Sequence, residues 1–301
     1  MARDLTSTIL VGLCTLAVAV PPVAHAAAKF ATEEPQTAAV PVPLVPLTRS
    51  NIKSIEEIRN EPAEIMAVAW PPDGNELVCL IYHRSPREEG VEVREVESLG
   101  VLKKIAEGRR ILAFAFNPVE PQAAWATDGN RVEILNLETG EGVYLEDVGR
   151  QPNLAFRPDG KVLATGGAAG WIKLWNAETA ELLHTLEINR NRLVAVPVFS
   201  PDSRLLAVAN VRGKTTVWDA ETGEKKYELP PENNTLSCAF DPGSGQLATV
   251  HTGGRLALWN AETGAAIREQ EVEDQAPQSV RWLDGGNLLA TVGPGVVAFF
   301  N

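Results

Sequence analysis

The chain has 301 residues and a net charge of −12, because 39 Asp and Glu side chains outnumber 27 Lys and Arg. This acidic balance argues against general nucleic-acid binding, which needs clustered cations to displace counterions. The three cysteines lie in separate runs and do not form a disulfide framework, so we expect Cys79 and Cys238 to be buried as small hydrophobic side chains.

The N-terminal segment has the features of a secretory signal peptide. An apolar run covers residues 5–20 and is shorter than the ~20 residues that a transmembrane helix needs. It is followed by Ala24-His25-Ala26, a small-x-small pattern of the kind that signal peptidase cleaves. We therefore expect a signal peptide over residues 1–26 and an exported protein, periplasmic or secreted, whose mature domain does not insert into a membrane. The alternative is an uncleaved N-terminal segment that tethers the protein to a membrane.

Residues 27–50 are interpreted as a linker. They contain Pro35, Pro41, Pro43 and Pro46 and show neither helical nor alternating periodicity. Prolines at this density favour an extended, polyproline-like chain. Roughly 250 residues remain, which is enough for one all-β domain with a sizeable core.

An internal repeat covers the rest of the chain. An aromatic residue, followed by a turn rich in Pro, Asp or Gly and then by an apolar run, recurs at intervals of 40 to 46 residues. The aromatic residues are Trp70, Phe116, Phe156, Phe199, Phe240 and Trp282. Short strands at such even spacing, with turn residues between them and no helical windows, predict an all-β assembly.

A second phrase follows these copies at a steady offset. It is an alternating strand that stops at Asn or Asp in front of a Glu-Thr turn. Asn and Asp side chains accept hydrogen bonds from backbone amides two residues further on, so the phrase predicts a hairpin turn between two strands. The residues that mark the repeat are Asn136, Trp175, Asn176, Trp218, Asp219, Trp259 and Asn260.

The period near 42 residues, with Trp-Asp or Trp-Asn closing the third strand of three copies, resembles the WD repeat. The resemblance covers residues 51–301 and implies a β-propeller whose blades are four-stranded antiparallel sheets. One feature departs from the family. Members often carry a Gly-His pair before the innermost strand, and its His joins a Trp–Ser/Thr–His–Asp hydrogen-bond network. This pair is missing here. We therefore expect apolar packing to hold the blades together, with Trp175, Trp218 and Trp259 as bulky contributors.

Six copies of the repeat predict a six-bladed propeller. The sixth copy stops after its third strand, and residues 52–59 lie as far before Trp70 as an outer strand lies before the next aromatic residue in complete copies. Because an unpaired edge strand is a liability, we expect this N-terminal segment to pair with residues 296–301 and close the ring. The alternative is a truncated seven-bladed propeller.

No sequence motif of catalysis, metal binding or cofactor binding stands out. His83, His184 and His251 have no partner at metal-ligand spacing, and neither a nucleophile elbow nor a phosphate-binding glycine loop occurs. We therefore expect no enzyme activity, no cofactor and no metal, and a structural or solvated role for these histidines. The alternative is an enzyme built on the propeller, either a hydrolase or a quinone-dependent oxidoreductase.

Charge differs between the two faces that the strand connections would form. The turns between third and fourth strands carry the acidic residues Glu138, Glu141, Glu178, Glu181, Glu221, Glu224 and Glu262. The loops of the opposite face carry the cations Arg84, Arg87, Arg109, Arg110, Arg150, Arg190, Arg192, Arg212, Lys214 and Arg255. From these we predict a basic binding rim of Arg110, Arg150, Arg192, Arg212 and Arg255. Trp171 is either its aromatic anchor or packing between blades.

A propeller without catalytic motifs predicts a protein-interaction scaffold. Because arginine pairs bidentately with carboxylates, the basic rim fits an acidic protein partner. Two alternatives remain open: the loops are charged only because they are exposed, or the rim binds a small anionic ligand or a glycan. We expect a monomeric mature domain that binds no nucleic acid.

Overall fold

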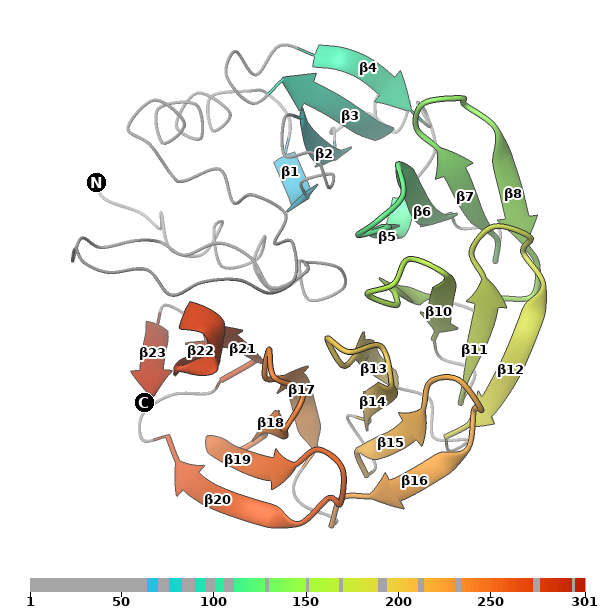
Figure 1. Cartoon of the computed structure of the whole chain (residues 1–301). Coiled ribbons are helices and arrows are strands. Elements are labelled where there is room, and N and C mark those ends of the chain that lie inside the picture. Colours follow the sequence, from blue (N-terminus) through green and yellow to red (C-terminus); the bar gives the residue numbers. More distant parts are fainter. Residues whose placement is uncertain are drawn as a thin grey trace, which may run out of the picture.

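The computed structural model describes an all-β arrangement. The described residues are 64–69, 76–82, 90–95, 101–105, 111–127, 130–149, 152–167, 170–188, 194–210, 214–230, 234–272, 277–293 and 296–300. Within them, antiparallel sheets follow one another in chain order around a common centre (Figure 1). Five of these sheets have four strands and the last has three.

Each sheet is a meander, so the order of a strand in the repeat sets its distance from the centre. The innermost strands are β1 (Glu64–Ala69), β5 (Ile111–Phe116), β9 (Asn153–Phe156), β13 (Val194–Phe199), β17 (Thr235–Phe240) and β21 (Ser279–Leu283). The second strands are β2 (Glu76–Tyr82), β6 (Gln122–Thr127), β10 (Val162–Gly166), β14 (Leu205–Asn210), β18 (Gln246–His251) and β22 (Leu288–Gly293). A short 3₁₀ turn, η2 (Asp284–Gly286), joins β21 to β22.

The two outer positions of the sheets complete the blades. The third strands are β3 (Gly90–Glu95), β7 (Val132–Asn136), β11 (Trp171–Asn176), β15 (Thr216–Asp219), β19 (Arg255–Asn260) and β23 (Val296–Phe300). The outer strands are β4 (Val101–Ile105), β8 (Gly142–Leu145), β12 (Leu182–Glu187), β16 (Lys225–Glu228) and β20 (Ala266–Glu271). The predicted four-stranded antiparallel repeat is thus confirmed. Residues 52–59, predicted to supply a fourth strand beside β23, lie outside the described residues, as do the signal peptide over 1–26 and the linker over 27–50.

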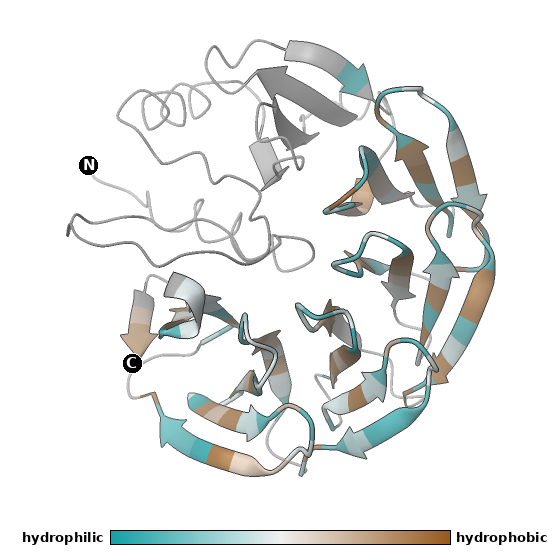
Figure 2. Ribbon diagram, in the orientation of Figure 1, coloured by the Kyte–Doolittle hydropathy of each residue, from teal (hydrophilic) through white to brown (hydrophobic). Residues whose placement is uncertain are grey.

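Burial follows the position of each strand. The second strands β10 and β14 are buried along their whole length, because both of their faces are covered by neighbouring sheets. The outer strands β16 and β20 are mostly exposed, and Figure 2 shows hydrophilic residues along much of both. This gradient explains why the second strands read as continuous apolar runs in the sequence.

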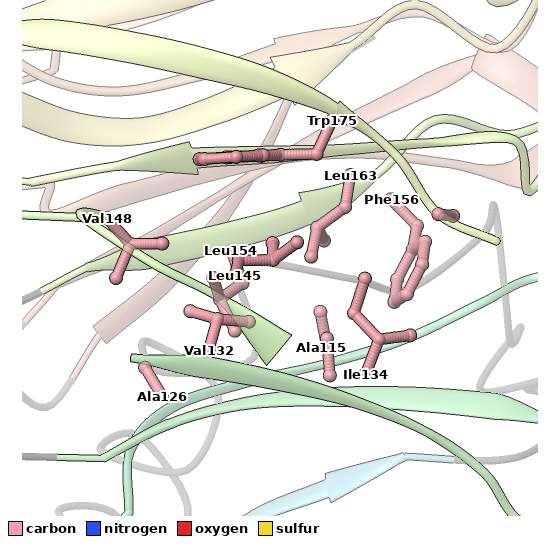
Figure 3. Packing of buried hydrophobic residues seen from close by; sticks show 12 residues of the cluster. Ala115, Ala126, Val132, Ile134, Leu145, Val148, Leu154, Phe156, Leu163 and Trp175 are labelled. Atoms are coloured by element: carbon pink, nitrogen blue, oxygen red, sulfur yellow. The ribbon is translucent and has the colours of Figure 1, made fainter. Parts of the chain in front are cut away.

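The core is divided into clusters that lie between successive sheets. In each of three seams, the aromatic residue that ends an innermost strand and the Trp near the end of the third strand pack on the preceding sheet. Figure 3 shows the first of these, where Phe156 lies beside Ile134 and Trp175 belongs to the same cluster. Only 6%, 7% and 1% of the surface of Trp175, Trp218 and Trp259 is exposed, which confirms their predicted packing role.

Apolar packing fills these seams as expected, but hydrogen bonds of the repeat Trp residues, which were not predicted from the sequence, add to it. The indole N–H groups of two repeat Trp residues donate to threonines of the second strand of the same sheet: Trp175 to Thr165 and Trp259 to Thr249, both at 2.8 Å. In the sheet between them, where the second strand offers Val208 instead, Trp218 donates to Thr216 of its own strand at 3.0 Å. A buried indole N–H without a partner would be costly, so each of these seams supplies one.

A longer network surrounds Trp259 and includes His251, a histidine that is not part of a Gly-His pair. His251, the last residue of β18, is buried, and its Nε2 lies 2.8 Å from the hydroxyl of Thr249. Its Nδ1 lies 3.3 Å from the hydroxyl of Thr235, to which Thr215 donates at 2.9 Å. The imidazole thus joins the second strand of one blade to residues at the boundary with the preceding blade.

The hairpin turns after the third strands have the predicted geometry. The side-chain oxygens of Asn136, Asn176, Asp219 and Asn260 each accept two backbone N–H groups at 2.8–3.1 Å. At Asp219, the N–H of Thr222 and then that of Glu221 favour the carboxylate over burial and hold the pKa of Asp219 below its ordinary value. The repeat markers therefore act as turn-forming residues, as the sequence indicated.

Candidate interaction faces

The strand connections form two opposite faces of the arrangement of sheets. Because neighbouring strands run antiparallel, the first–second and third–fourth connections lie at one end of each sheet, and the remaining connections lie at the other. We call the first set the turn face and the second set the loop face. Figure 1 shows the sheets arranged side by side, so each face combines connections from several blades.

The turn face carries the acidic residues predicted for it. All seven are exposed: Glu138, Glu141, Glu178, Glu181, Glu221, Glu224 and Glu262. Two of them bind cations of a neighbouring sheet, Glu221 to Arg157 at 2.8 Å and Glu262 to Lys226 at 2.7 Å. Part of this acidity is therefore neutralised across the seams between blades.

Arg157 is a buried cation of the turn face that sequence reasoning missed. Its guanidinium contacts Asp159 through two nitrogens, at 3.0 and 2.8 Å, and reaches Glu221 of the next sheet with a third. Burial disfavours ionisation of Asp159, but hydrogen bonds from Arg157 and from the N–H of Lys161 outweigh it and lower the pKa of Asp159. The signal that could have found Arg157 is the polar residue that follows the aromatic in four copies, namely Asn117, Arg157, Ser200 and Asp241.

The loop face carries a recurring ion pair. Arg131, Lys214 and Arg255 lie at equivalent positions, at or just before the start of a third strand. Each pairs with a glutamate on, or next to the end of, the outer strand of its own sheet: Arg131 with Glu146 at 2.6 Å, Lys214 with Glu228 at 2.9 Å, and Arg255 with Glu269. These cations are therefore balanced within their own blades.

The predicted basic rim stays a prediction. Arg110, Arg150, Arg192 and Arg212 lie outside the described residues. Arg255 lies on the loop face as expected and is paired with Glu269. The pairing reduces the net positive charge that Arg255 adds to this face.

Trp171 begins β11 at the loop face and is half-buried. The ammonium of Lys173 lies 4.6 Å from the centre of its ring and 5.5 Å from that of Trp175. The same ammonium donates to the backbone oxygen of Asp147 at 2.8 Å and to its carboxylate at 2.7 Å, in the connection that precedes β9. Trp171 is therefore linked through Lys173 to the connection from the preceding blade and also keeps part of its surface in solvent.

His184 and Cys238 are held by contacts within the fold. The Nε2 of His184 donates to the backbone oxygen of Glu221 at 2.9 Å, and His83 lies outside the described residues. Burial raises the pKa of the Cys238 thiol to about 12, so the side chain is buried as predicted and stays protonated. No group of three or more His, Cys, Asp or Glu in the described ranges is placed to hold a metal ion. Nor does any helix in that part of the chain have the length and apolarity to cross a bilayer.

Repeated four-stranded blades around a centre, closed by Asx turns and with Trp residues in the seams, define a β-propeller of the WD-repeat type. The family model of the anaphase-promoting complex subunit 4 WD40 domain matches residues 145–198, which contain the whole blade from β9 to β12. A chain in the crystal structure of the mitotic checkpoint complex has a similar fold. Its TM-score is 0.66 at 20% identity, and the match covers 80% of this chain and 75% of that one.

Two curated relatives are eukaryotic translation initiation factor 3 subunit I proteins. The one from Bombyx mori is 23% identical over 154 residues, which are 46% of this chain and 45% of the relative. The one from Anopheles gambiae is 24% identical over 152 residues, or 45% of each chain. The matched segments thus span less than half the length of these relatives.

Proposed function

We propose that this protein is an exported interaction scaffold that binds a protein partner and catalyses no reaction of its own. The observation that carries the proposal is the WD-repeat arrangement of sheets, whose two faces combine strand connections from several blades. The printed names of the similar proteins support it, since each is a subunit or part of a multi-protein assembly. Export rests on residues 1–26, and the mass of the protein isolated from its own host tests whether they are removed.

The proposed site is the basic rim of the loop face, which would receive an acidic partner. In an affinity capture with the protein as bait, changing Arg150, Arg192 and Arg255 together to Glu is expected to abolish recovery of the partner. The matched control changes Glu141, Glu181 and Glu224 of the turn face to Arg and is expected to leave recovery intact. Equal recovery by both variants, with normal folding, would reject the loop face as the site.

We further propose that six blades close the ring, with residues 52–59 as the fourth strand beside β23. Phe299 of β23 is 60% exposed, as expected of a strand whose outer neighbour is missing among the described residues. Deleting residues 50–60 is expected to lower the melting temperature by about 5 °C or more. Deleting residues 30–40 of the linker serves as the control and is expected to leave it unchanged. A melting temperature like that of the full chain after the first deletion would contradict this closure.

A further inference from the structure

The recurring ion pair of the loop face is interrupted in one blade. Arg131, Lys214 and Arg255 mark its position in three sheets, and in the sheet of β9 to β12 the equivalent residue is Trp171. The register of β11 with β12 places Glu187 directly opposite Trp171. Directly opposite residues of an antiparallel pair project on the same side of the sheet, so an aromatic ring and a carboxylate are neighbours here.

Glu187 lacks the cation that Glu146, its counterpart in the preceding blade, binds. Glu146, which lies opposite Arg131 as Glu187 lies opposite Trp171, binds that arginine at 2.6 Å. In the other two blades the cation binds a glutamate two residues before the opposite position, Lys214 to Glu228 and Arg255 to Glu269. Glu187 is exposed, and within the described ranges its carboxylate makes no ion pair or hydrogen bond. Compared with the Arg131–Glu146 pair of the preceding blade, this blade thus keeps the acid, and an indole stands in place of the cation.

The Trp171 ring already attracts a cation. Lys173 lies 4.6 Å from its centre, and Asp147 balances that ammonium at 2.7 Å, so the charge of Lys173 repels a second cation only weakly. A second cation has to approach the ring from the side that Lys173 leaves free. It would meet the ring quadrupole there, next to the residue that the register places opposite Trp171, namely Glu187.

We propose that Trp171 and Glu187 receive an arginine side chain of the protein partner. The guanidinium would stack on the indole and pair with the carboxylate, forming between two chains a pair like that of Arg131 and Glu146 within one blade. Arginine fits better than lysine because its planar fork both stacks on aromatic faces and bonds carboxylates bidentately. The inference rests on the proposed scaffold function, for which it supplies a specific contact.

The test uses small arginine probes, so it does not require the partner to be known. The protein is labelled at the indole nitrogens of its seven Trp residues and titrated with N-acetyl-arginine amide, followed by nuclear magnetic resonance. The Trp171 signal, assigned by its loss in W171F, is expected to shift in a saturable way at about millimolar concentration. N-acetyl-citrulline amide has the same shape without the charge and is expected to leave the signal in place.

Two matched variants locate the contact. E187Q keeps the size of the side chain and is expected to weaken arginine binding about fivefold, because the charge is lost. E269Q makes the same change beside Arg255, in a blade that has its own cation, and is expected to leave binding at Trp171 unchanged. An equal response to arginine and citrulline, or unchanged affinity in E187Q, would overturn the inference.

A further variant distinguishes binding of a partner's arginine at Trp171 from binding of an arginine of this chain. Arg190 and Arg192 follow Glu187 closely in the sequence and lie outside the described residues. If the wild-type protein gives no response and the double variant R190Q/R192Q does, the chain fills the position itself and the inference fails. A captured partner without an arginine response also overturns it, whereas an arginine response without any partner counts against the scaffold function alone.

Discussion

Replacing Gly264 by alanine is expected to lower the free energy of unfolding by about 3 kcal/mol, whereas the same replacement at Gly140 is expected to lower it by about 1 kcal/mol. Both glycines hold equivalent places in the turns after third strands, with φ of +71° and +75°. At either site the positive φ is unfavourable for alanine and lowers the free energy of unfolding. A Cβ at Gly140 meets open space, but at Gly264 it would lie 2.6 Å from Cδ2 of Tyr227 in the preceding blade.

The larger cost arises because Tyr227 cannot move away without losing a bond. Its hydroxyl donates to the backbone oxygen of Ala261 in the same turn as Gly264. Burial raises the pKa of Tyr227, so the hydroxyl remains a donor over the usual pH range. The seam before it is built alike: a Cβ at Gly223 would lie 2.7 Å from Cγ of His184.

Urea unfolding of G264A, G140A and the wild type measures these costs. A double-mutant cycle with Tyr227→Ala isolates the contact, since removing the ring is expected to reduce the cost of G264A to that of G140A. Equal costs of G264A and G140A in the wild-type background would contradict the account of this seam.

The fold was predictable because its signals are local and repeat. An Asx turn needs only the side chain of Asn176 and the amides two and three residues later, and that relation recurs in four copies. Burial of Trp175 and its equivalents follows in the same way from the alternation of a short strand. Contacts that join two blades are different, because the partners lie one or more repeats apart. Arg157 and Glu221 are 64 residues apart, and nothing in either local sequence indicates the other.

The Trp–Thr bonds were missed for a different reason. In the family the network is recognised by the histidine of a Gly-His pair, which this sequence does not have. The signal was the phrase Leu-Ala-Thr, which stands at residues 163–165, 247–249 and 289–291, always at the same distance from the preceding aromatic residue. On the loop face, likewise, Glu228 and Glu269 lie on the outer strand about two residues from the position opposite Lys214 and Arg255, a relation that the loop sequences alone do not reveal.

In the third copy of the Leu-Ala-Thr phrase, no Trp side chain of the described residues is placed to donate to the threonine. Thr291 has the register position of Thr165 and Thr249, but the residue two places beyond its partner Ala298 is Phe300, where the other blades have Trp175 and Trp259. A phenyl ring has no N–H to donate. Thr291 is only 1% exposed, and its hydroxyl has no hydrogen-bond partner in the described part of the chain.

Valine at this position is therefore expected to have opposite effects in two blades. Thr291→Val removes an unpaired buried hydroxyl at nearly constant shape and is expected to raise the free energy of unfolding by about 1 kcal/mol. Thr249→Val leaves the Trp259 N–H and the His251 Nε2 without their partner and is expected to lower it by about 2 kcal/mol. Thr165→Val removes the partner of the Trp175 N–H only. Its change in the free energy of unfolding is expected to lie between those of the other two variants, closer to that of Thr249→Val.

The missing indole donor of the last blade can be restored by a substitution at Phe300. Phe300→Trp restores the donor and is expected to stabilise the protein when Thr291 is present but not in the T291V background, because the gain depends on the hydroxyl. Urea midpoints at constant slope measure all these variants, and the sign of each change is more informative than its size. If Thr291→Val destabilises the protein as Thr249→Val does, the hydroxyl of Thr291 has a partner, and the last blade is built like the others.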